Sequence, residues 1–263
     1  MNGLFSFLKA PFRGLGVLGV VLSAAITFFT RIPLWRVVDI PKESYSRIIG
    51  FWPLTGWITG AVTGGTWLVF SMLLPPLPAI IGALVVRILL TGGFHEDGLS
   101  DFFDGFGGGR TKADILRIMK DSSVGSYALI GMILYYLLLI STLASIPKGI
   151  LFVVLFAADP FSKLLTTGMM NFLPYARTES ESKSKTLYDK LGVGGFLVAG
   201  VFGLLPLFLF VDRRLWFSAL VPLCLVILLF FYVRKRIGGY TGDICGATAL
   251  LCELTFYLAV SCL

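Results

Sequence analysis

Three aspartates in the segment Gly92–Ser126 have the spacing expected of a site for a hard metal ion. Asp97, Asp101 and Asp104 stand four and three residues apart. On a helix these positions fall within about 60° of one another, on one face. Carboxylates so close repel, so either their pKa values rise or a hard divalent cation binds among them. Mg²⁺ suits such oxygen ligands, whereas Zn²⁺ is disfavoured because the chain has one histidine and no cysteine nearby.

The acidic spacing has a second interpretation, because charge runs are usually solvated helix faces. His95 stands beside the cluster and is a candidate general base, although a histidine next to acids is more often a hydrogen-bonded neighbour. On the residues alone, both alternatives stay open.

A glycine-rich turn that ends in an arginine follows the aspartates. Glycines let backbone N–H groups face an anion, and arginine binds phosphate in a bidentate manner. A glycine run can equally end a helix. We expect Gly107, Gly108 and Arg110 to contact a phosphate group, with Lys120 and Asp121 as further substrate-binding residues.

A short amphipathic helix is predicted after the turn. Thr111 and Asp114 form a capping-box pattern, which predicts a helix that runs through Lys120. Its apolar stripe consists of Ile115, Ile118 and Met119. The helix is expected along the membrane interface, either in contact with substrate or as a packing helix with snorkelling basic side chains.

Two more polar groups interrupt the apolar sequence. Asp243, in the polar segment 238–246, is expected either to join the same metal site or to act as a helix N-cap. Asp159 and Lys163 stand four residues apart inside an apolar stretch. Such an intramembrane pair is either functional or a mutually neutralised pair within a helix bundle.

The elements that must position these residues are membrane helices. Apolar residues make up 56% of the 263 residues, charged residues only 14%, and the mean hydropathy is +0.87. These values exclude an ordinary soluble enzyme and a disordered chain. Apolar stretches of span length cover about 15–33, 49–74, 78–94, 123–146, 149–171, 193–211, 215–233 and 244–262. We predict an all-α, polytopic bundle of seven or eight spans with one short interfacial helix, forming a single domain over 1–263.

The basic residues predict the orientation of the bundle. Most of the 22 lysines and arginines fall in segments 31–48, 95–122, 172–192 and 234–243. By the positive-inside rule these segments face the cytoplasm. The net charge of +7 is therefore explained without a nucleic acid partner.

The segment 92–127 closely resembles the cobalamin synthase family, also called adenosylcobinamide-GDP ribazoletransferase. Three further segments resemble signatures of that family in matching order, namely Thr27–Pro33, Phe51–Gly56 and Gly238–Asp243 with Gly246-Ala247. Ser100 stands where alanine is usual in the family. The segment Tyr175–Ser180 keeps the family pattern only in part, so no role is assigned to Arg177.

The resemblance implies a Mg²⁺-dependent transferase of cobalamin (vitamin B12) biosynthesis that completes nucleotide loop assembly in a prokaryotic cell (inner) membrane. The 3′-hydroxyl of α-ribazole, or of its 5′-phosphate, would attack the cobinamide-linked phosphorus of adenosylcobinamide-GDP, and GMP would leave. The resemblance and the spacing together place Asp97, Asp101, Asp104 and Asp243 at the metal, with one carboxylate or His95 as the proton acceptor. The expected partners are these substrates and the lipid bilayer, and homo-oligomerisation is left open.

Two other functions compete with this one. A CDP-alcohol-type phospholipid phosphotransferase would use the same metal chemistry on a different acceptor. A membrane transporter is the third candidate, because several polar groups lie at membrane depth. Transporter sites tend to lie at the bilayer midplane, whereas the acidic cluster is predicted at the cytoplasmic edge.

Overall fold

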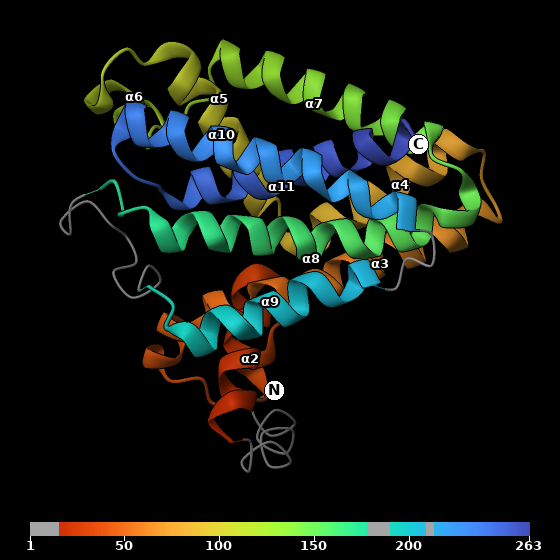
Figure 1. Cartoon of the computed structure of the whole chain (residues 1–263), viewed down its shortest axis with the longest axis horizontal. Helices are drawn as coiled ribbons and strands as arrows, with labels where there is room; N and C mark the ends of the chain where they lie inside the picture. The colour runs from red at the N-terminus through yellow and green to blue at the C-terminus, as the bar shows by residue number, and fades with distance from the viewer. Residues whose placement is uncertain (1–15, 178–189, 209–212) are drawn as a thin grey trace, which may run out of the picture.

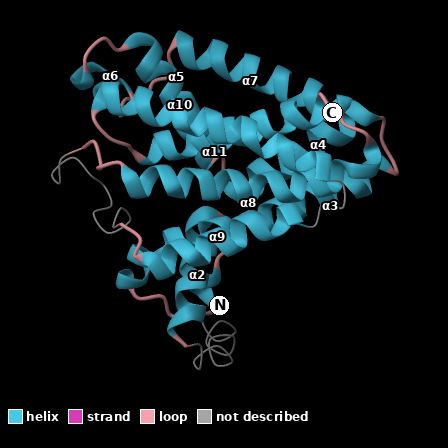
Figure 2. Ribbon diagram, in the orientation of Figure 1, coloured by secondary structure: helices cyan, strands magenta, loops and turns pink. Residues whose placement is uncertain are grey.

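The computed structural model describes residues 16–177, 190–208 and 213–263, and in these ranges the chain is a helix bundle (Figures 1 and 2). The predicted cytoplasmic segment 172–192 therefore lies partly outside the described residues. Eight helices coincide with the eight apolar stretches: α2 (Val17–Phe29), α3 (Trp52–Ser71), α4 (Pro76–Thr91), α7 (Ser126–Ser145), α8 (Lys148–Phe172), α9 (Val193–Phe208), α10 (Leu220–Ile237) and α11 (Gly242–Ser261). The predicted all-α fold is confirmed.

Shorter elements connect these helices. The acidic segment forms α5 (Phe94–Gly108), and α6 (Lys112–Ile118) follows it. The described residues also form 3₁₀ helices, namely η2 (Leu34–Arg36), η3 (Lys42–Phe51) and η4 (Arg213–Ala219). The predicted capping box is present, because the Asp114 N–H donates to Thr111 Oγ1 at 3.1 Å and the Thr111 N–H donates to Asp114 Oδ2 at 3.2 Å.

Several helices are long and apolar enough to cross a membrane. Within the described residues four meet that requirement: α7, α8, the segment Leu215–Ile237 that ends in α10, and α11. The consecutive helices α4 and α5 would supply a fifth span only as a pair, and they bend by 94°. The helices α2 and α9 are apolar but shorter. The chain is thus a membrane protein, with fewer full-length spans than apolar stretches.

Two consecutive glycines make the bend between α4 and α5. Gly92 has a φ of 74° and Gly93 a φ of 72°. This left-handed region is readily open to glycine and costly for other residues. The turn sends α5 away from the direction of α4, so α5 lies at the end of the bundle instead of continuing through it.

Small residues let α3 pack closely against α8. A Cβ atom at Gly56 would stand 2.7 Å from the Cα atom of Pro160, and one at Gly60 would stand 3.0 Å from the carbonyl oxygen of Phe156. Close backbone approach of this kind is the usual basis of helix association in membranes. It brings the polar side chains of the two helices together.

Buried ion pairs neutralise the charges inside the bundle. Lys163 pairs with Asp159, and Thr59 Oγ1 donates to Asp159 Oδ2 at 2.6 Å while it accepts from Lys163 Nζ at 2.9 Å. Arg87 donates to both carboxylate oxygens of Glu253, at 2.7 and 2.5 Å. The structure therefore favours mutual neutralisation for Asp159 and Lys163.

One end of the bundle collects the polar segments. In Figure 1, α5 and α6 lie at the end where α8 finishes and α11 begins. We call this end the polar rim.

Candidate active site

The aspartates of α5 face one cavity at the polar rim. Asp97, Asp101 and Asp104 line a cavity of about 340 Å³, and Asp243 from the first turn of α11 lines the same space. Asp97 is exposed, Asp101 is half-buried and Asp104 is buried. The predicted common face is confirmed, and we call this space the acidic cavity.

A glycine brings α11 against α5. A Cβ atom at Gly98 would stand 2.7 Å from the carbonyl oxygen of Asp243, so a larger residue would force the two helices apart. Thr241 is the N-cap of α11 and accepts from the Ile244 N–H at 3.4 Å. The N-cap interpretation of Asp243 is therefore wrong, and its carboxylate faces the acidic cavity.

A short backbone pairing holds Arg177 beside Asp243. The Ala176 N–H donates to the Tyr240 carbonyl and the Tyr240 N–H donates to the Pro174 carbonyl, both at 2.9 Å. This pairing joins the segment after α8 to the segment before α11. As a result Arg177 Nη2 lies 3.1 Å from Asp243 Oδ2, and Arg177 lines the acidic cavity.

Both carboxylate oxygens of Asp104 accept hydrogen bonds from the backbone at the start of α7. One carboxylate oxygen accepts from the Gly125 N–H at 2.6 Å and the other from the Ala128 N–H at 2.8 Å. A negative group at a helix N-terminus satisfies N–H groups that lack intrahelical partners and interacts favourably with the helix dipole. Asp104 thus anchors α7 to α5, whichever further role it has at the cavity.

The carboxylates of the acidic cavity crowd one another. Burial together with the nearby charges of Asp243 and Asp97 raises the pKa of Asp101 to about 7, although Arg177 opposes the shift. Asp101 is harder to ionise while its neighbours are charged, and burial likewise raises the pKa of Asp243. The cavity therefore favours an added cation or proton.

Comparisons with known proteins show which family the chain belongs to. The family described as cobalamin-5-phosphate synthase matches residues 21–261. The chain belongs to this family. A relative from Shewanella sp. (strain W3-18-1), named adenosylcobinamide-GDP ribazoletransferase, is 36% identical over 90% of this chain and 91% of its own length. One of the same name from Leptospira interrogans (serogroup Icterohaemorrhagiae, serovar copenhageni) is 37% identical over 90% and 93%. No solved structure matches the chain.

Family membership makes the chain a transferase and confirms the resemblance described above. Of the predicted substrate-binding residues, Lys120 and Asp121 line the acidic cavity, just after the end of α6. The Ser123 N–H donates to Asp121 Oδ1 at 2.9 Å, and this bond lowers the pKa of Asp121. Lys120 and Arg177 are the cations that line the acidic cavity.

The glycine turn and its arginine lie apart from the acidic cavity. Gly107 and Gly108 are the last residues of α5, and a Cβ atom at Gly107 would stand 2.6 Å from the ring of Tyr127. Arg110 is exposed and does not line the cavity. The turn therefore ends a helix in this structure, and its predicted contact with a phosphate has no counterpart in the cavity wall.

His95 is turned into the apolar core. Its ring is stacked on Trp52 at 5.9 Å and on Phe29 at 6.4 Å, measured between ring centroids, and its side chain is 3% exposed. Within the described residues Nε2 has no hydrogen-bond partner. His95 does not line the acidic cavity, so the cavity wall supplies no geometric support for a general base at this position.

The acidic cavity has the donor chemistry of a magnesium site. In the described part of the chain, no three His, Cys, Asp or Glu side chains converge closely enough to hold a metal ion unaided. Mg²⁺ usually takes one or two carboxylates and completes its shell with water and substrate phosphate. Asp97, Asp101 and Asp243 supply such carboxylates, so the residues fit Mg²⁺ that binds together with a phosphate ligand.

Arg177 is the functional candidate that sequence reasoning missed. Its position depends on pairing between segments more than sixty residues apart, which no local pattern predicts. The partial match of the segment Tyr175–Ser180 to the family was the available signal.

Proposed function

We propose that this enzyme transfers the adenosylcobinamide-phosphate group of adenosylcobinamide-GDP to the 3′-hydroxyl of α-ribazole or its 5′-phosphate. A bond forms between the 3′-oxygen and the cobinamide-linked phosphorus, the bond from that phosphorus to GMP breaks, and the hydroxyl proton passes to a base. The names of the relatives support the substrates. The observation that carries the proposal is the acidic cavity, where carboxylates and two cations face one another at the polar rim.

Asp97, Asp101 and Asp243 would hold Mg²⁺ together with phosphate oxygens of the substrate. When bound, the ion would offset the charge that develops on the transferred phosphate and on GMP. Asp104 is a weaker candidate ligand than these three, because both of its oxygens already accept backbone hydrogen bonds.

Arg177 and Lys120 would bind the diphosphate of the substrate. Arginine suits this task because its planar fork contacts phosphate oxygens in pairs. Arg177 is paired with Asp243 in the described structure, and its Nε has no partner among the described residues. An anionic substrate in the cavity would therefore offer the guanidinium group a ligand that it lacks.

The proton acceptor is expected among the carboxylates of the cavity. A general base must reach the hydroxyl, and its pKa should lie near the working pH. The carboxylates that line the cavity meet the first condition. The pKa of Asp101 is raised to about 7 in the cavity without a cation, so Asp101 meets the second condition only where it is not itself a ligand of Mg²⁺, because a bound cation favours the ionised form. His95 is buried and does not line the cavity, so it does not meet the first condition.

The polar rim is expected to face the cytoplasm of a prokaryotic cell. The predicted cytoplasmic segments supply the rim with Arg177, Lys120 and the basic end of α10. The positive-inside rule supports this orientation in a cell membrane. That the whole chain forms one domain stays a prediction.

The experiment that tests the function is GMP release by the purified enzyme. Adenosylcobinamide-GDP and α-ribazole are supplied with Mg²⁺, and the corrinoid product is identified by mass spectrometry. GMP release that depends on α-ribazole is expected. Transfer only to a lipid alcohol would favour the CDP-alcohol type of reaction, and uptake into proteoliposomes without GMP release would favour transport.

A further inference from the structure

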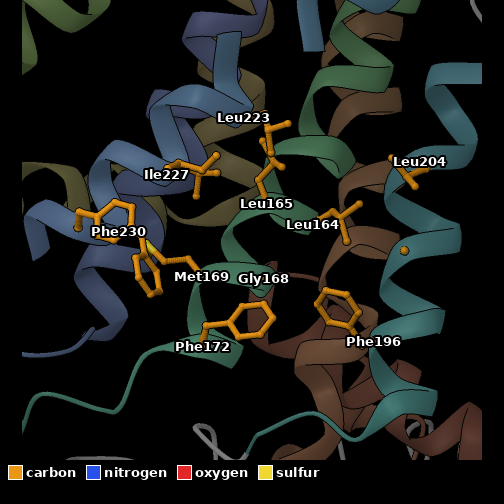
Figure 3. A pocket seen from close by; sticks show the side chains of 13 residues that line it. Leu164, Leu165, Gly168, Met169, Phe172, Phe196, Leu204, Leu223, Ile227 and Phe230 are labelled. Carbon is orange, nitrogen blue, oxygen red and sulfur yellow. The ribbon is translucent and has the colours of Figure 1, made fainter. Parts of the chain in front are cut away.

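An apolar groove runs between α8, α9 and α10 (Figure 3). It shares no lining residue with the acidic cavity. Its volume is about 450 Å³, and all 13 residues that line it are apolar or glycine. In Figure 3, Leu204 and Leu223 lie toward one end of the groove and Phe172 and Phe196 toward the other. Because α8 and α10 are long and apolar enough to cross a membrane, we expect the groove to lie within the bilayer.

Two glycines keep the groove open. A Cβ atom added at Gly168 of α8 or at Gly200 of α9 would meet no atom within 4 Å. These positions therefore leave space on the walls of the groove, in contrast to Gly56 and Gly60, where another backbone fills the space. A hollow of this kind in a bilayer suits a thin flexible chain, and lipid acyl chains are the surrounding medium.

The face of α10 that lines the groove continues into a positive charge. Leu223, Ile227 and Phe230 line the groove and are spaced by four and three residues, so they share one helix face. Arg234 stands four residues after Phe230, on the same face, and Lys235 follows it. Both side chains are exposed, and no carboxylate within the described ranges forms an ion pair with either.

A third cation lies at the same end of the groove. The Leu191 N–H donates to Asn171 Oδ1 at 3.0 Å, which ties the segment before α9 to the last turn of α8. Lys190 is the neighbour of Leu191 and is exposed. Phe172, which lines the groove, is the neighbour of Asn171. The apolar groove thus ends near basic side chains of α10 and of the segment before α9.

We propose that this groove binds an anionic phospholipid, with an acyl chain between α8, α9 and α10 and the phosphate against Arg234 and Lys235. Basic clusters where membrane helices reach the interface recognise anionic headgroups, with each cation contributing separately. The positive charge at this end of the groove favours an anionic lipid over a second apolar helix as the occupant, because such a helix would bring no anion to Arg234. The site is separate from the acidic cavity and does not depend on the reaction proposed above.

The test uses lipid retention by the full-length protein. The enzyme is reconstituted in vesicles of equal parts phosphatidylglycerol and phosphatidylcholine, extracted in mild detergent and examined by native mass spectrometry. The wild-type protein is expected to retain phosphatidylglycerol in excess. Gly168→Leu fills the groove and should abolish retention of both lipids. The matched control is Gly149→Leu on the same helix, where an added Cβ also meets nothing, and it should retain lipid as the wild type does.

Charge variants separate the headgroup from the acyl chain. Replacing Arg234 or Lys235 by Gln should lower the preference for phosphatidylglycerol about fivefold for each cation removed, while total lipid retention persists. If Gly168→Leu fails to fold, as judged by its thermal unfolding midpoint, Gly200→Leu fills the groove from α9 and replaces it. Equal retention of the two lipids by the wild type would overturn the proposal. So would unchanged retention in the filled variant, or a dimer that Gly168→Leu dissociates.

Discussion

Gly98 of α5 lies against the backbone of Asp243 at the start of α11, where a Cβ atom would stand 2.7 Å from the Asp243 carbonyl oxygen. This contact sets the distance between the two acidic elements of the cavity. The missing side chain at Gly98 thus places Asp243 beside Asp97 and Asp101.

Gly98→Ala is therefore expected to impair catalysis more than folding. The methyl group would displace the start of α11 and move Asp243 away from the substrate phosphates, and small displacements of catalytic groups can cost about a hundredfold in rate. The comparison is GMP release by this variant and by Gly65→Ala, a change on α3 where an added Cβ meets nothing within 4 Å. Equal rates for the two variants would show that the contact does not position the site.

Replacing Arg177 and replacing Arg110 should affect substrate binding differently. Arg177 lines the acidic cavity and Arg110 does not. Arg177→Gln should raise the KM for adenosylcobinamide-GDP by about tenfold or more, since charge-assisted hydrogen bonds contribute roughly 1.5–3 kcal/mol. Arg110→Gln should change it little, and steady-state kinetics of both variants measure the difference. A larger increase in KM for Arg110→Gln than for Arg177→Gln would indicate that the substrate phosphate contacts the glycine turn, as the sequence suggests.

The raised pKa of Asp101 predicts a pH-dependent stability in the absence of divalent ions. Its pKa is about 7 in the folded protein and about 4 in an unfolded chain, so the folded state binds more protons between these values. Stability should therefore rise as the pH falls from 8 toward 5, relative to Asp101→Asn, which lacks this group. Thermal unfolding midpoints of the two proteins across that range give the comparison. Parallel curves would show that Asp101 ionises normally.

The buried pair of Asp159 and Lys163 should matter for stability as a unit. Lys163→Met leaves a buried carboxylate with Thr59 as its remaining described partner, which is expected to cost about 3–5 kcal/mol. Asp159→Leu combined with Lys163→Met removes both charges and should cost much less than the two single changes added together. The free energies of unfolding of the wild type, the two single variants and the double variant, measured in detergent, give the comparison. If the folded double variant keeps full GMP release, the pair is structural, whereas selective loss of activity would give it a functional role.

Local sequence patterns predicted the parts of the structure that depend on neighbours in the chain. The spacing of Asp97, Asp101 and Asp104 placed them on one face, and Thr111 with Asp114 marked the start of α6. The paired glycines Gly92 and Gly93 are a visible signal for the bend before α5, although the predicted apolar stretch 78–94 runs across them.

Contacts between distant segments could not be predicted from local sequence patterns. The carboxylate of Asp104 accepts hydrogen bonds from N–H groups 21 and 24 residues away, so its anchoring of α7 depends on the tertiary fold. Arg177 reaches the site through a backbone pairing with Tyr240, and Arg110 leaves it because α5 extends through Gly108. Spacing along a helix predicts a shared face, but it does not say which other segment covers that face.

The most direct test of the central claim is GMP release from adenosylcobinamide-GDP and α-ribazole, measured with and without Mg²⁺ for the wild type and for Asp97→Asn. Asp97 is exposed in the acidic cavity, so the change should leave folding and membrane insertion intact. We expect wild-type release that requires Mg²⁺ and a loss of at least about a hundredfold in the variant, in keeping with removal of a group that supports charge stabilisation in the transition state. Release that is independent of divalent ions, or near-full activity of Asp97→Asn, would contradict the assignment of the acidic cavity as the active site.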